Sequence, residues 1–272
     1  MNKLNTAKRV AIISALVEGN SLRSTQRMTG VSINTVTKLL VDAGEACARY
    51  QHETLRNLPC KRIQCDEIWS FCYAKAKNVP LEKQGILGYG DVWNWTALCA
   101  DTKLVPSWLV GARDGIHASH FIADLASRLA NRAQLTTDGH KPYLEAVEGA
   151  FGGEIDYAML IKLYGGSPDG EHRYSPAECT GAIKTPIVGT PDEAHISTSF
   201  VERQNLTMRM RRFTRLTNGF SKKLANLEAA VALHYMDYNF VRRHKTLRVS
   251  PAMAAGVSSK LWSIEDVVAI ID

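Results

Sequence analysis

The chain has 272 residues, of which 45% are hydrophobic, 22% charged and 8% aromatic. This length allows one large domain or two small ones, at roughly 100–200 residues per domain. The composition excludes collagen, a coiled coil and a wholly disordered chain. No run approaches the roughly 18 apolar residues that a membrane span needs, so we expect a soluble protein of the cytoplasm without membrane contact.

The net charge is +6, and the charged residues are unevenly distributed along the chain. Residues 1–62 hold ten Lys and Arg against four Asp and Glu, whereas residues 63–202 hold eleven against eighteen. Residues 203–223 hold seven Lys and Arg and no acid. An acidic middle between basic segments is typical of a protein that binds a polyanion at its ends. Charge alone does not distinguish this from a solvated basic surface.

The N-terminal segment has the pattern of three short helices. Residues 3–18 have apolar side chains near helical spacing, and Ser21 caps a second helix that ends before Gly30. Ser32 caps a third helix, so the segment predicts a helix-turn-helix, although a helix, glycine and helix also occur in plain bundles. Four polar residues at the start of the third helix would face outward and reach DNA base edges: Ser32, Asn34, Thr35 and Lys38.

The middle of the chain predicts an α/β fold with a mixed sheet. Segments with the composition of strands and helices alternate there. In chain order we expect three neighbouring strands in residues 61–74, 94–102 and 104–113, and a helix over 117–132. A short strand that runs into a glycine turn follows within residues 134–143, and helices follow from 199 onward. Residues 145–196 are rich in Gly, Pro and Ser, so we expect irregular loops there, apart from a strand near 157–165.

These elements divide the chain into three predicted parts. We expect a helix-turn-helix DNA-binding domain over residues 1–58, and a catalytic α/β domain over residues 59–256 with a loop-rich insertion at about 145–196. A helical tail follows over residues 257–272.

Three acids stand where a sheet could bring them together: Asp66 in the first strand, Asp138 after a later strand and Glu202 near the start of a helix. Carboxylates are hard ligands suited to Mg²⁺ or Mn²⁺, and such a cluster is how two-metal sites attack phosphodiesters. Spacing alone is weak support, because the 27 acids offer many triples.

Four segments of the sequence carry a more specific signal. They are IQCDEIWSF at 63–71, TTDGHKPY at 136–143, STSFVERQNLTMRMRRFTRLTNGFSKK at 197–223 and YNFVRRHKTLRVSPAMAAG at 238–256. Together they resemble the insertion-sequence DDE transposases, most closely the IS-one type. The resemblance implies a ribonuclease-H-like catalytic domain, with Asp66, Asp138 and Glu202 as catalytic residues that bind two Mg²⁺ or Mn²⁺ ions per active site. It also implies double-stranded DNA as partner, a homodimer or larger homo-oligomer, and a place in the prokaryotic cytoplasm at the nucleoid.

Asp66 is followed directly by another acid, Glu67. Successive strand residues point to opposite faces, so we expect that both cannot face one metal site. Alternation alone does not choose between them. Asp66 shares its face with Gln64, Ile68 and Ser70, whereas Glu67 shares its face with mainly apolar residues; this favours Asp66 for a polar site, and the resemblance agrees.

A basic helix follows the predicted catalytic glutamate. Asn205 and Arg209 lie three and seven residues after Glu202, on roughly the same helix face, and both could reach the scissile DNA. We expect the following cations to contact backbone phosphates, although each alone could be a solvated surface residue: Arg209, Arg211, Arg212, Arg215, Lys222 and Lys223. His140 could position the leaving strand or simply be a surface histidine in a turn.

The sequence lacks the cysteine-based zinc finger that commonly precedes the helix-turn-helix in this family. The sequence therefore predicts a DDE transposase that binds terminal inverted repeats, hydrolyses DNA strands at the ends and transfers the 3′-hydroxyl to target DNA. Two alternatives stay open. One is a catalytically silent helix-turn-helix regulator derived from a transposase, and the other is a structure-specific nuclease.

Overall fold

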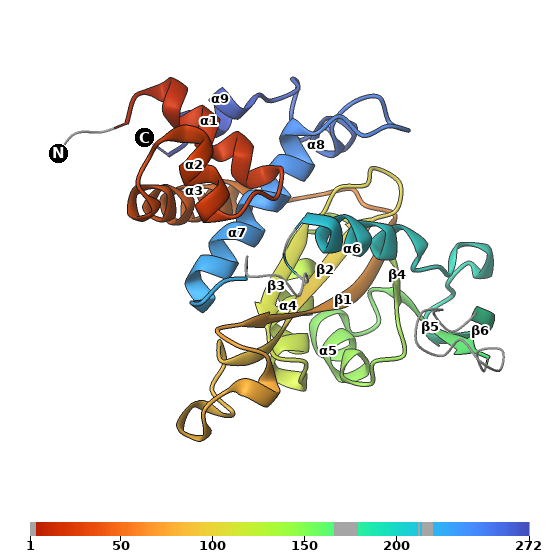
Figure 1. Ribbon diagram of the computed structural model, residues 1–272. Helices are drawn as coiled ribbons and strands as arrows, with labels where there is room; N and C mark the ends of the chain where they lie inside the picture. Colours follow the sequence, from red (N-terminus) through yellow and green to blue (C-terminus); the bar gives the residue numbers. More distant parts are fainter. Residues whose placement is uncertain (1–3, 166–178, 212, 214–219, 272) are drawn as a thin grey trace.

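The computed structural model of the chain describes residues 4–165, 179–211, 213 and 220–271. A mixed sheet with the strand order β3-β2-β1-β4-β5-β6 runs through the centre of the molecule (Figure 1). Its strands are β1 (Arg62–Cys72), β2 (Gly90–Cys99), β3 (Ser107–Gly111), β4 (Gln134–Thr137), β5 (Asp156–Tyr164) and β6 (Cys179–Val188). The predicted α/β class and the first four predicted strands are confirmed.

The sheet changes character on either side of β1. β1, β2 and β3 form an antiparallel meander, whereas β1, β4 and β5 are parallel, and β6 returns antiparallel to β5. β1 pairs with β4 over only three residues, from Arg62 opposite Gln134 to Gln64 opposite Thr136. Beyond that point one edge of β1 is open, because β4 ends at Thr137.

Helices cover both faces of the sheet. α4 (Gly115–Ala126) and α5 (Pro142–Phe151) pack on one face, where Trp95 of β2 contacts Phe121 and Tyr143. α6 (Ser199–Arg211) and α7 (Leu224–Met236) pack on the other, where the hydroxyls of Thr96 and Tyr235 lie 2.7 Å apart. Odd-numbered residues of β1 therefore face α4 and α5, and even-numbered residues face α6 and α7.

Three N-terminal helices pack against the C-terminal part of the chain. They are α1 (Thr6–Val17), α2 (Leu22–Thr29) and α3 (Ile33–Thr54), and their caps are Asn5, Ser21 and Ser32. Gly30 has a φ of 68°, which allows the tight turn between α2 and α3. α3 packs along α7, while α1 packs against α9 (Ile264–Ala269). Two shorter helices complete the C-terminal part: the π-helical turn η4 (Asp237–Val241) and α8 (Pro251–Ala254).

Within residues 145–196 the predicted strand near 157–165 is confirmed as β5, but the prediction of irregular loops around it is wrong. The described part also contains the end of α5, all of β6 and the short 3-10 helix η3 (Glu193–His195). β6 contains Gly181 and Pro186, which read as loop residues in the sequence. An edge strand tolerates both, because one side of it needs no hydrogen bonds. Residues 166–178 lie outside the described part of the chain.

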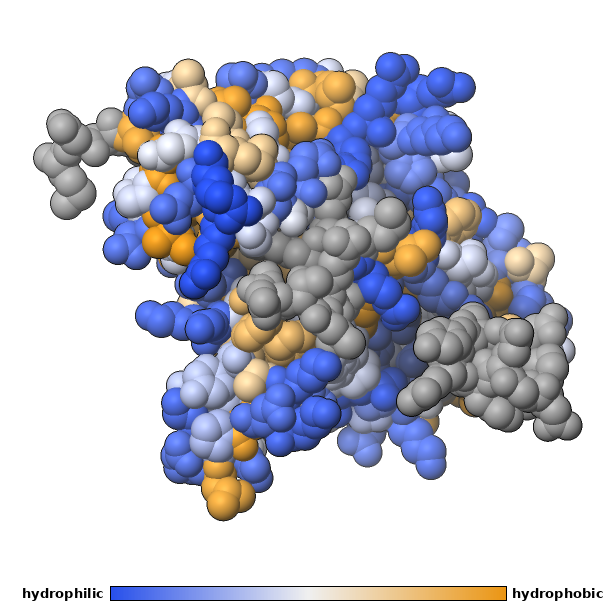
Figure 2. Space-filling model, viewed as in Figure 1, coloured by the Kyte–Doolittle hydropathy of each residue, from blue (hydrophilic) through white to orange (hydrophobic). Residues whose placement is uncertain are grey.

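The surface visible in Figure 2 is mostly hydrophilic, with an apolar tip at its lower end. Among the residues described, no helix combines the length and the apolar character needed to cross a membrane. The division into domains at residues 58 and 256 stays a prediction.

Replacing Gly44 by Ala tests the close approach of α3 to α7. A Cβ atom at Gly44 would lie 2.4 Å from the Cα and Cβ atoms of Ala229. We expect Gly44→Ala to lower the free energy of unfolding by about 1–3 kcal/mol, because backbone atoms cannot move aside. Gly149 of α5 has no atom within 4 Å of such a Cβ. Gly149→Ala is expected to raise it by up to about 1 kcal/mol. Equal effects in urea denaturation would contradict the close approach.

Candidate active site

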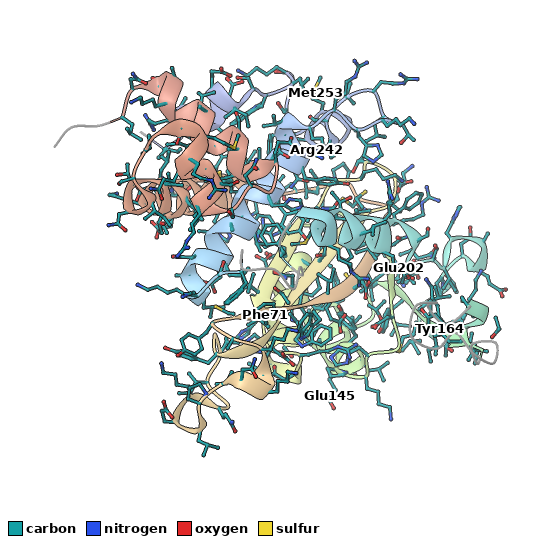
Figure 3. The ribbon with its side chains drawn as sticks, in the orientation of Figure 1. Phe71, Glu145, Tyr164, Glu202, Arg242 and Met253 are labelled. Carbon is teal, nitrogen blue, oxygen red and sulfur yellow. The ribbon has the colours of Figure 1, made fainter. Side chains whose placement is uncertain are left out.

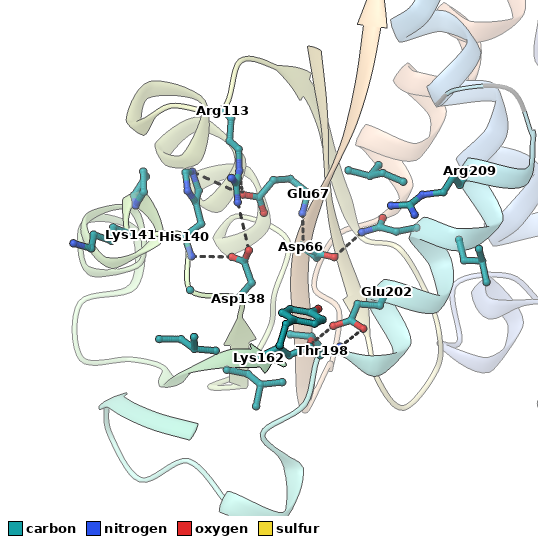
Figure 4. Close-up of a pocket in the computed structure, with 18 residues that line it drawn as sticks. Asp66, Glu67, Arg113, Asp138, His140, Lys141, Lys162, Thr198, Glu202 and Arg209 are labelled. Carbon is teal, nitrogen blue, oxygen red and sulfur yellow. Dashed lines mark hydrogen bonds and ion pairs between the residues drawn. The ribbon is translucent and has the colours of Figure 1, made fainter. Parts of the chain in front are cut away.

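An open cleft of about 860 Å³ lies where β4 ends, between β1, β5 and α6. Figure 3 shows Glu202 on α6 beside the sheet, and Figure 4 shows the cleft in close-up. Asp66 and Glu67 come from β1, Asp138 follows β4 directly and Glu202 comes from the first turn of α6. All three acids predicted from the sequence therefore line one cleft.

Three carboxylates form a close cluster in this cleft. One oxygen each of Asp66, Glu67 and Asp138 lies within 4.8 Å of the others. The prediction that Asp66 and Glu67 cannot share a site is therefore wrong. The two side chains do leave β1 on opposite faces, since Asp66 contacts α6 and Glu67 contacts Tyr143 of α5. Beyond the end of β4 no strand separates the two faces, so the longer Glu67 side chain reaches the same edge.

Each carboxylate of the cluster has its own donors. The Nδ2 amide of Asn205 donates to Asp66 over 2.8 Å, and the backbone N–H of Glu67 donates to Asp66 over 2.9 Å. Glu67 accepts from Nε of Arg113 over 2.9 Å and from the Tyr143 hydroxyl over 3.2 Å. The Nη2 atom of Arg113 also lies 3.5 Å from the Oδ2 atom of Asp138. Arg113 thus links two of the three acids.

Burial leaves two of these acids difficult to ionise. Burial and then the charge of Asp138 raise the pKa of Asp66 to about 7, against the hydrogen bonds that it accepts. The same two causes raise the pKa of Glu67 to about 7, although Arg113 opposes them. When all three carboxylates are ionised, the cluster therefore carries more negative charge than its donors balance.

Glu202 lines the cleft without joining the cluster. Its Oε1 atom accepts from the Thr198 hydroxyl over 2.6 Å, and its Oε2 atom accepts from the ammonium of Lys162. Lys162 belongs to β5. The predicted third member of the triad is thus ion-paired with a lysine at the side of the cleft.

The predicted DNA contacts divide into three groups. Asn205 and Arg209 line the cleft on α6, and Arg209 is exposed. Lys222 and Lys223 are exposed just before α7 and do not line it. The side chain of Arg211 and all of Arg212 and Arg215 lie outside the described part of the chain.

His140 is more enclosed than a surface histidine. Its side chain is 14% exposed and contacts the rings of Trp95 and Tyr143, with centroids 5.7 and 5.9 Å away. Its Nε2 atom is 3.8 Å from Glu67 and forms no hydrogen bond with any residue that the structure describes. Burial and then the charge of Arg113 lower the pKa of His140, so the neutral ring is favoured.

The four predicted base-reading residues are remote from the cleft. Ser32 caps α3 by accepting from the N–H of Thr35 over 3.3 Å. Asn34 and Lys38 are exposed, and Lys38 forms an ion pair with Asp42 at 2.5 Å. The start of α3 therefore presents a polar surface, as the sequence predicts.

The cluster has the chemistry of a divalent metal site. Carboxylate oxygens at this separation suit Mg²⁺ or Mn²⁺, and a divalent cation would balance the excess charge of the cluster. Asn205 is 5% exposed, and its Oδ1 atom is buried in the cleft wall, where none of the described residues donates a hydrogen bond to it. The residues present therefore fit such an ion.

The sequence reasoning missed Glu67, Arg113 and Lys162. Glu67 stands next to Asp66, but strand alternation allows only one of the two at the site, and the more polar face and the family resemblance favour Asp66. Arg113 follows the end of β3 by two residues and Lys162 lies within β5, and no local pattern marks either residue.

Comparison with known proteins gives no family assignment. No protein-family model matches the chain, and no curated protein sequence matches it. Among solved structures, the chain is similar to a cryo-EM structure of a piggyBac transposase synaptic complex with hairpin DNA. The TM-score is 0.43 and the identity 10%, over 99% of this chain and 71% of that chain. The function of the chain must therefore be inferred from its own cleft.

The raised pKa values make stability depend on pH. The pKa values of Asp66 and Glu67 in the folded protein lie near 7, above the roughly 4 of an unfolded chain. Between about pH 4 and 7 the folded state binds more protons than the unfolded state, so these groups destabilise the metal-free protein as pH rises through that interval. Thermal melting in EDTA should show this decline, and Glu67→Gln should reduce it. An equal slope in the variant would contradict this assignment.

A divalent cation should reverse this loss of stability at higher pH, because it binds the ionised carboxylates. We expect Mg²⁺ to raise the Tm at about pH 7.5 but not at about pH 5.5, where protons compete with the metal. Asp138→Asn should abolish the rise. Glu193→Gln, an exposed acid of η3 outside the cleft, is the matched control and should retain it. A rise that persists in Asp138→Asn would place the ion elsewhere.

Proposed function

We propose that this protein is a DDE transposase of the IS-one type, which cleaves DNA at the ends of an insertion sequence and joins the freed 3′-hydroxyl to target DNA. The observation that carries the proposal is the cluster of Asp66, Glu67 and Asp138 in an open cleft that Glu202 also lines. An open cleft with carboxylates in its floor and the cation Arg209 on its wall suits a phosphodiester in an extended polyanion. The motifs around these acids support the same function.

Asp66, Asp138 and Glu202 would hold two Mg²⁺ or Mn²⁺ ions, which activate the attacking water or 3′-hydroxyl and stabilise the leaving oxygen. The protein's own task is then to orient these side chains. Asn205 fixes Asp66, and Arg113 fixes Asp138 together with Glu67. To hold a metal ion, Glu202 would have to give up its ion pair with Lys162. The free ammonium of Lys162 would then be available to a DNA phosphate.

DNA recognition would use surfaces outside the cleft. In this proposal the first 58 residues form a helix-turn-helix whose polar residues at the start of α3 read the terminal repeats. Arg209, Lys222 and Lys223 would bind backbone phosphates, and the sheet with its helices would be the ribonuclease-H-like catalytic domain. Concerted cleavage of two ends needs at least two copies of the chain. The nucleoid of a prokaryotic cell is where such an enzyme would act.

A strand-transfer assay tests the proposed function. The substrate is a labelled duplex of the inverted repeats that should flank the gene, with Mg²⁺. We expect Asp66→Asn, Asp138→Asn and Glu202→Gln each to lower the rate of cleavage by about 10³-fold or more, because each removes a carboxylate that would bind the metal ions. DNA affinity should stay nearly unchanged. Glu193→Gln is the matched control and should cleave normally.

The same assay separates the alternatives. Joined products that depend on Glu202 support a transposase. Cleavage without joining would indicate a structure-specific nuclease, and metal-independent binding without cleavage would indicate a regulator. Full cleavage by any one of the three variants would remove that residue from the site.

The ion pair between Lys162 and Glu202 gives a separate prediction. Lys162→Gln removes a positive charge beside the proposed metal site and releases Glu202. We expect Mn²⁺ to bind this variant about 3–10-fold more tightly in the absence of DNA. Isothermal titration calorimetry measures the change. Lys184→Gln on β6, whose lysine donates to the backbone of Glu193, should bind Mn²⁺ like the wild type. Weaker Mn²⁺ binding by Lys162→Gln would contradict the proposal that Glu202 leaves Lys162 to hold a metal ion.

A further inference from the structure

The connection between β1 and β2 forms a projecting loop with an apolar tip. It spans residues 73–89 and contains two short 3-10 helices, η1 (Ala76–Asn78) and η2 (Leu81–Lys83). The loop extends beyond the lower end of the sheet in Figure 1, and its tip is the apolar projection in Figure 2. Leu81 is 84% exposed, and Ile86 and Leu87 are exposed beside it. Such exposure of apolar side chains at the end of a projection needs a physical reason.

The base of the loop is braced. The ammonium of Lys83 lies over the rings of Tyr73 and Tyr89, at 4.6 and 5.0 Å from their centroids. The two tyrosine rings contact each other edge to face, with centroids 5.0 Å apart. Val79 is buried, and its carbonyl accepts from the Gln84 side chain over 3.1 Å. These contacts hold Leu81 outward on a fixed support.

The loop carries an excess of positive charge. Lys75, Lys77 and Lys83 belong to it, and its one acid is Glu82, next to Leu81. The backbone N–H of Tyr73 donates to the carbonyl of Ser221 over 2.9 Å, so Lys222 and its neighbour Lys223 stand beside the loop base. Figure 3 labels Phe71 just before the loop, and its ring contacts Phe220 with centroids 4.8 Å apart. The loop therefore adjoins the exposed lysines before α7.

An exposed apolar side chain on a loop that also carries lysines matches one kind of partner. Duplex DNA offers phosphates to the lysines and stacked bases to the apolar side chain, and apolar wedges are known to enter base steps from the minor groove. A protein partner would need a strongly acidic rim around an apolar pocket. Charge complementarity thus favours DNA.

We infer that Leu81 is a wedge that enters the minor groove of bound DNA and unstacks one base step, while Lys75, Lys77 and Lys222 hold the adjacent phosphates. The inference rests on the proposed function. It adds a DNA contact that lies outside the helix-turn-helix and outside the basic helix.

The strand β1 sets where the wedge acts. Seven residues separate Asp66 from Tyr73, which at about 3.3 Å per residue is roughly 23 Å along the strand. DNA rises about 3.4 Å per base pair, so for a duplex that runs along β1 the loop base would stand roughly 7 base pairs from the reacting phosphate. The unstacked step should lie at about that distance or slightly farther.

The experiment uses the full-length protein and the inverted-repeat duplex, with 2-aminopurine placed in turn at about 5–12 base pairs from the cleaved phosphate. We expect the wild type to raise the fluorescence at one or two adjacent positions. Leu81→Ala should abolish that rise and weaken binding about tenfold, because a buried leucine side chain is lost. Lys77→Gln should lower the slope of log affinity against log salt by about 1.

Leu261→Ala is the matched control, because Leu261 is also exposed but lies in the C-terminal segment. Leu261→Ala should behave like the wild type. The Tm of Leu81→Ala should be unchanged, because the exposed Leu81 side chain buries little surface in the folded chain. Wild-type affinity and fluorescence in Leu81→Ala would overturn the inference. So would loss of self-association by that variant in analytical ultracentrifugation without DNA, which would make the tip a protein contact.

The two proposals fail in different ways. A wild-type protein that cleaves and joins DNA with no fluorescent step anywhere would overturn the wedge alone. A wild-type protein that binds no DNA would overturn both the wedge and the proposed function.

Discussion

The short parallel pairing of β1 with β4 is the constraint on which the cleft depends. Asp66 and Asp138 are far apart in the sequence, but the register that pairs Gln64 with Thr136 brings them side by side when it is continued by two residues. β4 ends just before Asp138, so the edge of β1 is open there. That open edge allows Glu67 to reach the same point from the opposite face of the sheet. A longer β4 would separate the two faces of the sheet and keep the Glu67 carboxylate on the face of Tyr143, away from Asp66.

Charge balance explains why so many elements meet at this edge. Three carboxylates within 4.8 Å repel one another strongly in a partly buried setting. The donors come from different parts of the fold: Arg113 follows β3, Asn205 belongs to α6 and Tyr143 to α5. These neutral and singly charged donors do not offset the burial and the repulsion, which together raise the pKa values of Asp66 and Glu67 to about 7. The fold thus holds an arrangement that a divalent cation would stabilise further.

The sequence predicts the central strands and the acids more reliably than their surroundings. β1 is a run of β-branched, aromatic and other buried residues, so its identity and the place of Asp66 follow from local pattern. The role of Glu67 does not, because side-chain alternation describes a strand with neighbours on both sides. β6 was missed because Gly and Pro usually mark loops. Its edge position, which permits them, is a property of the whole sheet.

The pairing of Glu202 with Lys162 shows a further limit of the sequence. The motif places Glu202 on α6, and the structure confirms that it faces the cleft. Whether its carboxylate meets the other acids depends on Lys162 of β5, which lies 40 residues earlier in the chain.

One rigid element connects the two ends of the inferred DNA path. β1 carries Asp66 and Glu67 at its centre and continues directly into the loop that presents Leu81. Its ten-residue ladder with β2 fixes the strand, so the loop base cannot move independently of the acids. A wedge fixed in this way would select the phosphate that reaches the cleft by its distance from a deformable base step. Position along the DNA would then be set by the length of β1 as well as by base contacts at the start of α3.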